Sequence, residues 1–186
     1  MDNNILHYQT SQLNGNFGVC IHDVSRDDLY NANFQAVAYE LWVQHGGLLA
    51  IRGSALASIS PEDLLSISRT FGKIEEEMQA ARDGKTVSGY PILRIGNLIN
   101  KRGQSISQFA QVPKLNSDAD IQYNPGTRRP VWHTDSTFRK RPPIGSVFHC
   151  RIAPSSGGDT LFADTKTAFE RLDDEKKQHL EKLEAI

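Results

Sequence analysis

The sequence has 186 residues, of which 38% are hydrophobic and 23% are charged, with a formal net charge of −1. This composition is typical of one soluble globular domain and excludes collagen-like and disordered chains. The two cysteines are too few for a disulfide framework, and the small net charge argues against general nucleic-acid binding. Residues 1–10 lack the basic and apolar regions of a secretory signal, and the longest apolar run, residues 48–51, is far shorter than a membrane span. We therefore expect a cytoplasmic protein that binds neither membrane nor nucleic acid.

The first third of the chain alternates strand and helix signals. Residues 17–21 predict a short strand, and apolar residues recur at helical spacing over residues 34–42. Gly46 and Gly47 can end that helix, because glycine readily adopts the left-handed conformation found after helix termini. A second strand is expected at residues 48–52.

The next helix has clear start and stop signals. Ser60 can cap its N-terminus, Pro61 suits its first position, and Gly72 follows its last apolar residue. Residues 90–95 predict another strand. The long aperiodic stretch 97–120 is rich in Ser, Gln and Asn, and we interpret it as a lid loop.

The C-terminal part combines short strands with two helices. Strands are expected at residues 131–133, 145–152 and 160–162, separated by turns rich in Pro and Gly. Such short strands favour a sandwich or barrel. Asp164 and Asp173 can each cap a helix near the end of the chain.

Residues 132–138, WHTDSTF, carry the most informative motif. On an extended backbone, side chains two residues apart point to the same face, so His133 and Asp135 can present an imidazole nitrogen and a carboxylate oxygen to one point. That pair is two thirds of the two-histidine, one-carboxylate triad that binds Fe(II) and leaves adjacent positions open. The alternative is a turn in which Asp135 caps the following amides and His133 is a core residue.

The chain resembles the taurine dioxygenase-like family of Fe(II)- and 2-oxoglutarate-dependent oxygenases. Its order of motifs carries the resemblance: HGGLLAIRG at 45–53, SPE at 60–62, FG at 71–72, WHTDSTF at 132–138, PP at 142–143 and GGDTLFAD at 157–164. The resemblance covers most of the chain, and the two motifs that contain His133 and Thr160 are its most specific part.

The resemblance implies a fold and a set of site residues. The fold would be α+β, a double-stranded β-helix (jelly roll) with flanking helices, formed by residues 1–186 as the N-terminal portion of a single oxygenase domain. His133 and Asp135 would be metal ligands, and the hydroxyl of Thr160 would contact a carboxylate of 2-oxoglutarate. From the residues alone, Thr160 is better explained as a β-branched residue that opens a strand after a Gly-Gly turn.

The family's third ligand, a distal histidine, and its 2-oxoglutarate-binding arginine lie farther downstream than this chain extends. The histidines that follow His133 are His149, in a predicted strand, and His179, in the predicted terminal helix. Neither stands in a motif like the family's distal one. We therefore expect the fold to be incomplete in this chain, and the chain alone to be inactive.

Other residues point to the substrate. Five basic residues surround the metal motif and would attract an anion, although they could equally form a solvated rim balanced by acidic residues: Arg128, Arg129, Arg139, Lys140 and Arg141. Tyr123 and Asn124 precede the motif and could line a substrate cavity with Arg129, although Asn-Pro-Gly is also a turn signal. Cys20 and Cys150 have no neighbouring base or metal-ligand spacing and are expected to be buried.

These inferences lead to one principal function. We expect a dioxygenase that uses Fe(II), 2-oxoglutarate and O2 to hydroxylate a small anionic organic molecule, with 2-oxoglutarate decarboxylated to succinate. The alternatives are a truncated or degenerate relative that binds a partner without catalysis, and a metal-free module that binds anions. A homo-oligomer is compatible with all three.

Overall fold

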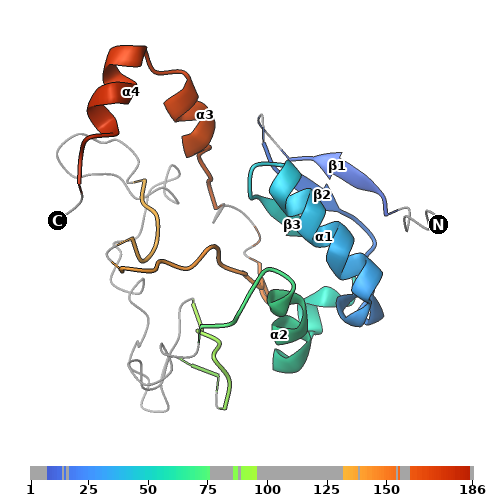
Figure 1. Cartoon of the computed structure of the whole chain (residues 1–186). Helices are drawn as coiled ribbons and strands as arrows, with labels where there is room; N and C mark the ends of the chain where they lie inside the picture. Colours follow the sequence, from blue (N-terminus) through green and yellow to red (C-terminus); the bar gives the residue numbers. More distant parts are fainter. Residues whose placement is uncertain are drawn as a thin grey trace.

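The computed structural model describes residues 8–13, 15, 17–75, 86–87, 89–95, 132–137, 139–153, 155 and 160–184. Its N-terminal part, residues 8–75, contains a small sheet with helices packed against it (Figure 1). Its C-terminal part contributes an extended segment and two short helices. The predicted lid, residues 97–120, and the candidate substrate residues Tyr123, Asn124 and Arg129 lie outside the described residues.

The sheet has three strands in the order β1-β2-β3. Strand β1 (Thr10–Gln12) pairs antiparallel with β2 (Val19–Ile21), which pairs parallel with β3 (Leu49–Ile51). A parallel pair needs a long crossover, and here the crossover contains helix α1 (Ala32–Gln44). The strands predicted at residues 17–21 and 48–52 are confirmed. Strand β1 was not predicted, because its residues are polar and exposed.

Helix α1 ends where its glycines predict, and it begins at a cap that the sequence analysis did not identify. The Asn31 side chain accepts hydrogen bonds from the backbone amides of Asn33 and Phe34, at 2.9 and 3.2 Å, and so caps the helix. At the other end Gly46 and Gly47 have φ of 74° and 78°, the left-handed region that favours glycine. The chain can therefore turn directly from α1 into β3.

Helix α2 (Pro61–Arg69) begins with a complete capping box. The Ser60 hydroxyl accepts from the Asp63 amide, and the Asp63 carboxylate accepts from the Ser60 amide. Asp63 is also fully buried and accepts hydrogen bonds from Arg26 and from Tyr30, which belongs to the 3-10 helix η1 (Asp27–Tyr30). One carboxylate therefore both caps α2 and fastens η1 to it.

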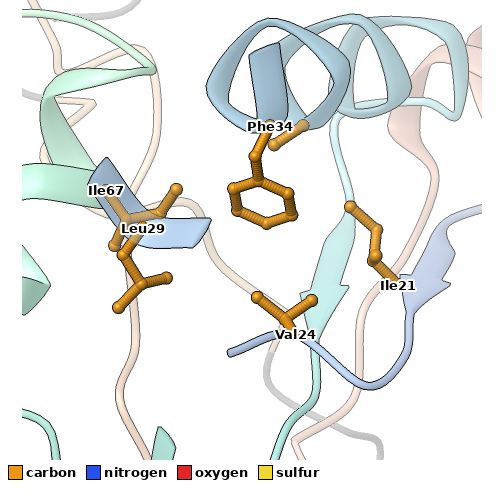
Figure 2. Close-up of a cluster of buried hydrophobic side chains, with 6 residues drawn as sticks. Ile21, Val24, Leu29, Phe34 and Ile67 are labelled. Atoms are coloured by element: carbon orange, nitrogen blue, oxygen red, sulfur yellow. The ribbon is translucent and has the colours of Figure 1, made fainter. Parts of the chain in front are cut away.

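The hydrophobic core lies between the sheet, α1, η1 and α2. Figure 2 shows the ring of Phe34 pointing from α1 toward Val24, with Ile21 on one side and Leu29 and Ile67 on the other. Each of these five residues is at most 4% exposed. Burial of one such side chain contributes about 1.5–3 kcal/mol, so this cluster dominates the stability of residues 8–75.

The C-terminal helices form as predicted, but the predicted strands do not. Helix α3 (Thr165–Glu170) is capped by Asp164, and helix α4 (Asp174–Leu180) by Asp173. The described residues of the expected strands 131–133, 145–152 and 160–162 pair with no strand. Residues 90–95 likewise give only an isolated bridge between Thr86 and Leu93.

The missing pairing has a physical consequence for exposure. A strand is stable only when its backbone groups bond to a neighbour, and among the described residues this segment has none beside it. Its large apolar side chains are correspondingly exposed, including Ile144, Phe148 and Ile152.

Cys20 is buried as expected, whereas the expectation for Cys150 is wrong, because Cys150 lies in this exposed segment. In the described part of the chain, no helix has the length and apolar character needed to cross a bilayer.

Candidate functional site

The structure brings His133 and Asp135 together. The Nε2 atom of His133 lies 3.3 Å from Oδ1 of Asp135, and each side chain is 68% exposed. Residues 132–134 belong to no helix or strand, and residues 135–137 form a turn in which Ser136 adopts a φ of 60°. This left-handed conformation is uncommon for a residue other than glycine. A turn is present, as in the alternative interpretation, but His133 is exposed and is not a core residue.

The geometry of the pair can be compared with that of two ligands on one metal ion. Imidazole nitrogen and carboxylate oxygen bind first-row metals at about 2.1 Å, so two such donors at right angles are about 3 Å apart. The 3.3 Å separation of Nε2 and Oδ1 is close to that value. Imidazole and carboxylate donors also suit Fe(II). The pair therefore fits two adjacent positions on a divalent ion.

A third ligand is not found in the described part of the chain, where no three His, Cys, Asp or Glu side chains are grouped to hold a metal. His149 directs Nε2 at the backbone carbonyl of Leu56, at 2.7 Å. His179 lies exposed in the last turn of α4. Neither histidine joins the pair.

Thr160 is exposed and precedes α3. No hydrogen bond among the described residues joins its hydroxyl to His133 or Asp135. The structure therefore shows no direct bond between Thr160 and the pair, and its role at the site stays a prediction.

The basic residues beside the motif are partly neutralised. Arg139 forms an ion pair with Glu75, and its amide donates to the carbonyl of Ser136 at 3.1 Å. The neighbouring Lys140 and Arg141 are exposed. Arg128 and Arg129 lie outside the described residues. The Arg139 pair matches the balanced-rim interpretation for one of the five basic residues.

Sequence reasoning included a basic rim balanced by acidic residues, and the ion pair between Arg139 and Glu75 is of that kind. It missed one contact of the segment that follows the motif. The contact between His149 and Leu56 involves a backbone acceptor, for which a sequence carries no signal.

Comparison with known proteins agrees with the family resemblance that the motifs indicate. The model of the family described as taurine catabolism dioxygenase TauD, TfdA family matches residues 9–186. An alpha-ketoglutarate-dependent sulfonate dioxygenase of Saccharomyces cerevisiae is 27% identical over 183 residues, which are 98% of this chain and 40% of that protein. An (S)-phenoxypropionate/alpha-ketoglutarate-dioxygenase of Sphingobium herbicidovorans is 26% identical over 96% of this chain and 52% of its own.

A third relative is more similar over a shorter region. Pentalenolactone F synthase of Streptomyces avermitilis is 33% identical over 131 residues, 68% of this chain and 36% of that protein. The chain thus spans about half, or less, of the length of these curated relatives. No solved structure matches it.

Proposed function

The chain belongs to the taurine catabolism dioxygenase TauD, TfdA family, and from that premise we propose that the protein is a 2-oxoglutarate-dependent dioxygenase that hydroxylates a small anionic organic substrate. The observation that carries the proposal for this chain's residues is the approach of His133 Nε2 to Asp135 Oδ1, at 3.3 Å. Both side chains are exposed, so a metal ion can reach the two donor atoms without rearrangement of a core.

His133 and Asp135 are proposed to hold Fe(II), and Thr160 to donate a hydrogen bond from its hydroxyl to a carboxylate of 2-oxoglutarate. When bound, Fe(II), 2-oxoglutarate and O2 supply the oxidation of a substrate carbon, with decarboxylation of 2-oxoglutarate to succinate. His133 must be neutral at Nε2 and Asp135 ionised to act as ligands, so metal binding displaces any proton that they share.

An anionic substrate is supported by the names of the relatives. They act on sulfonates, phenoxypropionate and, in a protein of Pseudomonas putida, sulfate esters. The exposed Lys140 and Arg141 lie a few residues beyond the pair and would attract an anion to it. Tyr123, Asn124 and Arg129 are proposed to contribute to the substrate site.

We further propose that residues 1–186 are the N-terminal portion of a single oxygenase domain with a double-stranded β-helix, and that residues 97–120 form a lid. Support comes from the match of the family model to residues 9–186 and from the share of each relative that the chain covers. The exposed apolar residues of the unpaired segment 144–152 would then pack in the complete fold.

The metal assignment can be tested by anaerobic calorimetric titration with Fe(II) of a version of the protein extended to the complete domain. We expect one ion to bind per chain, and His133→Ala and Asp135→Ala each to abolish binding. His179→Ala is the matched control, since it removes an exposed histidine from α4 and should bind as the parent does. Parental affinity in His133→Ala would contradict the assignment.

Activity is tested separately, by succinate formation from 2-oxoglutarate in the extended version, because the chain alone is expected to be inactive. Alkyl sulfonates, sulfate esters and phenoxypropionates form the substrate panel, with iron and ascorbate supplied. Succinate that depends on one of these anions supports the proposed substrate class. Succinate that appears only with uncharged organic substrates would contradict it.

A further inference from the structure

The extended segment 139–149 follows the metal motif and contacts the N-terminal part of the chain at four points. In Figure 1 it is part of the orange trace that runs toward α2. The contacts are an ion pair between Arg139 and Glu75, the approach of Ile144 to Gly72, the approach of Gly145 to Trp42, and a hydrogen bond between His149 and Leu56. No helix or strand forms along the segment, so these contacts determine where it lies.

The two central contacts are close. A Cβ atom built on Gly72 would lie 3.1 Å from Cδ1 of Ile144, and one built on Gly145 would lie 3.5 Å from Cζ2 of Trp42. In both, an apolar side chain lies against the backbone of a glycine without a directional bond, an arrangement that tolerates sliding. The polar contacts on either side of them, the ion pair of Arg139 and the hydrogen bond of His149, are therefore what fix the segment along its length.

His149 supplies the directional contact at the C-terminal end of the segment. Its Nε2 atom lies 2.7 Å from the carbonyl oxygen of Leu56, in the 3-10 helix η2 (Leu56–Ser58). A carbonyl oxygen can only accept a hydrogen bond, so Nε2 must carry the proton and donate it. A protonated Nε2 has no lone pair to offer a metal ion. His149 is also half-buried in a segment whose other side chains are mostly exposed.

We propose that His149 is a positioning residue that fixes the metal-bearing segment on the N-terminal part of the protein. Its imidazole N–H binds the Leu56 carbonyl, and the segment that it fixes leads back through Arg139 to the turn that holds Asp135 against His133. The effect on metal binding rests on the proposed function, whereas the attachment of the segment does not.

The test compares His149→Leu with His149→Gln. Leucine cannot donate a hydrogen bond, whereas the glutamine side-chain amide can donate from a similar distance. His179→Leu, in the exposed last turn of α4, is the matched control. Two readouts are used: the rate of tryptic cleavage after Arg151, two residues from His149, and the affinity for Co(II) followed by its visible absorption under anaerobic conditions.

We expect His149→Leu to be cleaved about threefold to tenfold faster and to bind Co(II) more weakly by a similar factor, the effect of one net hydrogen bond. His149→Gln and His179→Leu should match the parent in both measurements. This rescue by glutamine is what separates a positioning role from a merely structural role of the imidazole ring.

Other outcomes would overturn the inference. Parental cleavage of His149→Leu would show that the hydrogen bond does not hold the segment. Loss of Co(II) binding in both His149 variants, with parental cleavage, would make His149 a metal ligand instead. If neither the parent chain nor a version extended to the complete domain binds Co(II), the proposed function fails, and the cleavage rates alone then decide whether His149 attaches the segment.

Discussion

The hydroxyl of Tyr30 donates a 2.6 Å hydrogen bond to Oδ1 of Asp63, whose side chain is fully buried. The other carboxylate oxygen, Oδ2, accepts from Nε of Arg26 and from the amide of Ser60, each at 2.8 Å. Burial alone would raise the pKa of Asp63, but the hydrogen bonds from Tyr30, Ser60 and Arg26 outweigh it and hold the pKa below its usual range. The buried carboxylate is therefore charged and fully satisfied.

Replacement of Asp63 should destabilise the protein strongly. Asp63→Ala removes the acceptor for three donors and half of the α2 capping box, for an expected loss of about 2–4 kcal/mol in the free energy of unfolding. Urea denaturation measures the loss. Asp27→Ala, at an exposed position in the first turn of η1, is the control and should change the free energy by less than about 0.5 kcal/mol. Equal effects of the two variants would contradict the role of Asp63.

The Asp63 carboxylate also predicts that the free energy of unfolding falls at acid pH. A carboxyl group whose pKa is lowered by folding stabilises the protein above its unfolded pKa, which is near 4, and this contribution is lost as pH falls toward the folded value. We expect the difference in free energy of unfolding between the parent and Asp63→Asn to be constant near neutral pH and to shrink below pH 4. Urea midpoints measured from neutral pH to about pH 3 check this. A difference between the parent and Asp63→Asn that grows as pH falls would contradict the lowered pKa of Asp63.

Tyr8 predicts a corresponding loss at alkaline pH. Its hydroxyl donates to Oδ1 of Asp28 at 2.5 Å, and its ring lies edge-on to Phe34 with centroids 5.0 Å apart. Burial, followed by the bond to Asp28, raises the pKa of Tyr8 to about 12. A raised pKa stabilises the fold below the ordinary tyrosine value near 10, and that contribution is lost as pH rises toward 12.

Tyr8→Phe isolates this effect, because it keeps the ring contact with Phe34 and removes only the hydroxyl. We expect a loss of about 1 kcal/mol at neutral pH and a smaller difference from the parent above pH 10. Tyr39→Phe is the control, since no hydrogen bond of its hydroxyl is described and its side chain is largely exposed. An undiminished difference at alkaline pH would contradict the assignment to Tyr8.

Thr160 provides a prediction about the co-substrate. Thr160→Val preserves the shape of the side chain and removes the hydroxyl, so the affinity for 2-oxoglutarate should fall by about 1–2 kcal/mol, the value of one hydrogen bond to a charged group. Calorimetric titration of the metal-loaded protein measures this. Fe(II) affinity should be unchanged, and Thr165→Val, at the first position of α3, should have no effect on either ligand. Parental 2-oxoglutarate affinity in Thr160→Val would show that the Thr160 hydroxyl does not contact 2-oxoglutarate.

The helices were predictable from the sequence because their signals are local. Among the four α-helices of the described residues, Ser60, Asp164 and Asp173 cap α2, α3 and α4 as predicted, whereas the spacing did not identify Asn31 as the cap of α1. A cap contacts amides within three residues, so a short sequence window contains all the information it needs. The second role of Asp63, its contact with Tyr30, depends on packing and is invisible at that range.

Strand predictions depended on partners that a sequence window does not contain. Residues 48–52 contain a strand as predicted, because β2 is beside β3 in the fold and pairs with it. The segment 145–152 has a similar apolar pattern but pairs with no described strand. The approach of His133 to Asp135 was predictable for the opposite reason, since the two residues are separated by one residue and need only a locally extended backbone. Their role as metal ligands stays a prediction.

The order in which the protein is synthesised gives the position of the core a further meaning. Among the described residues, every buried apolar side chain lies between Val19 and Ile67. Ribosomes add residues in that order, and N-terminal units of a chain fold first. We therefore expect the N-terminal sheet and its helices to fold while His133 is still untranslated. Leu56 would then already present its carbonyl when His149 emerges, so the nascent metal-bearing segment would meet a preformed surface.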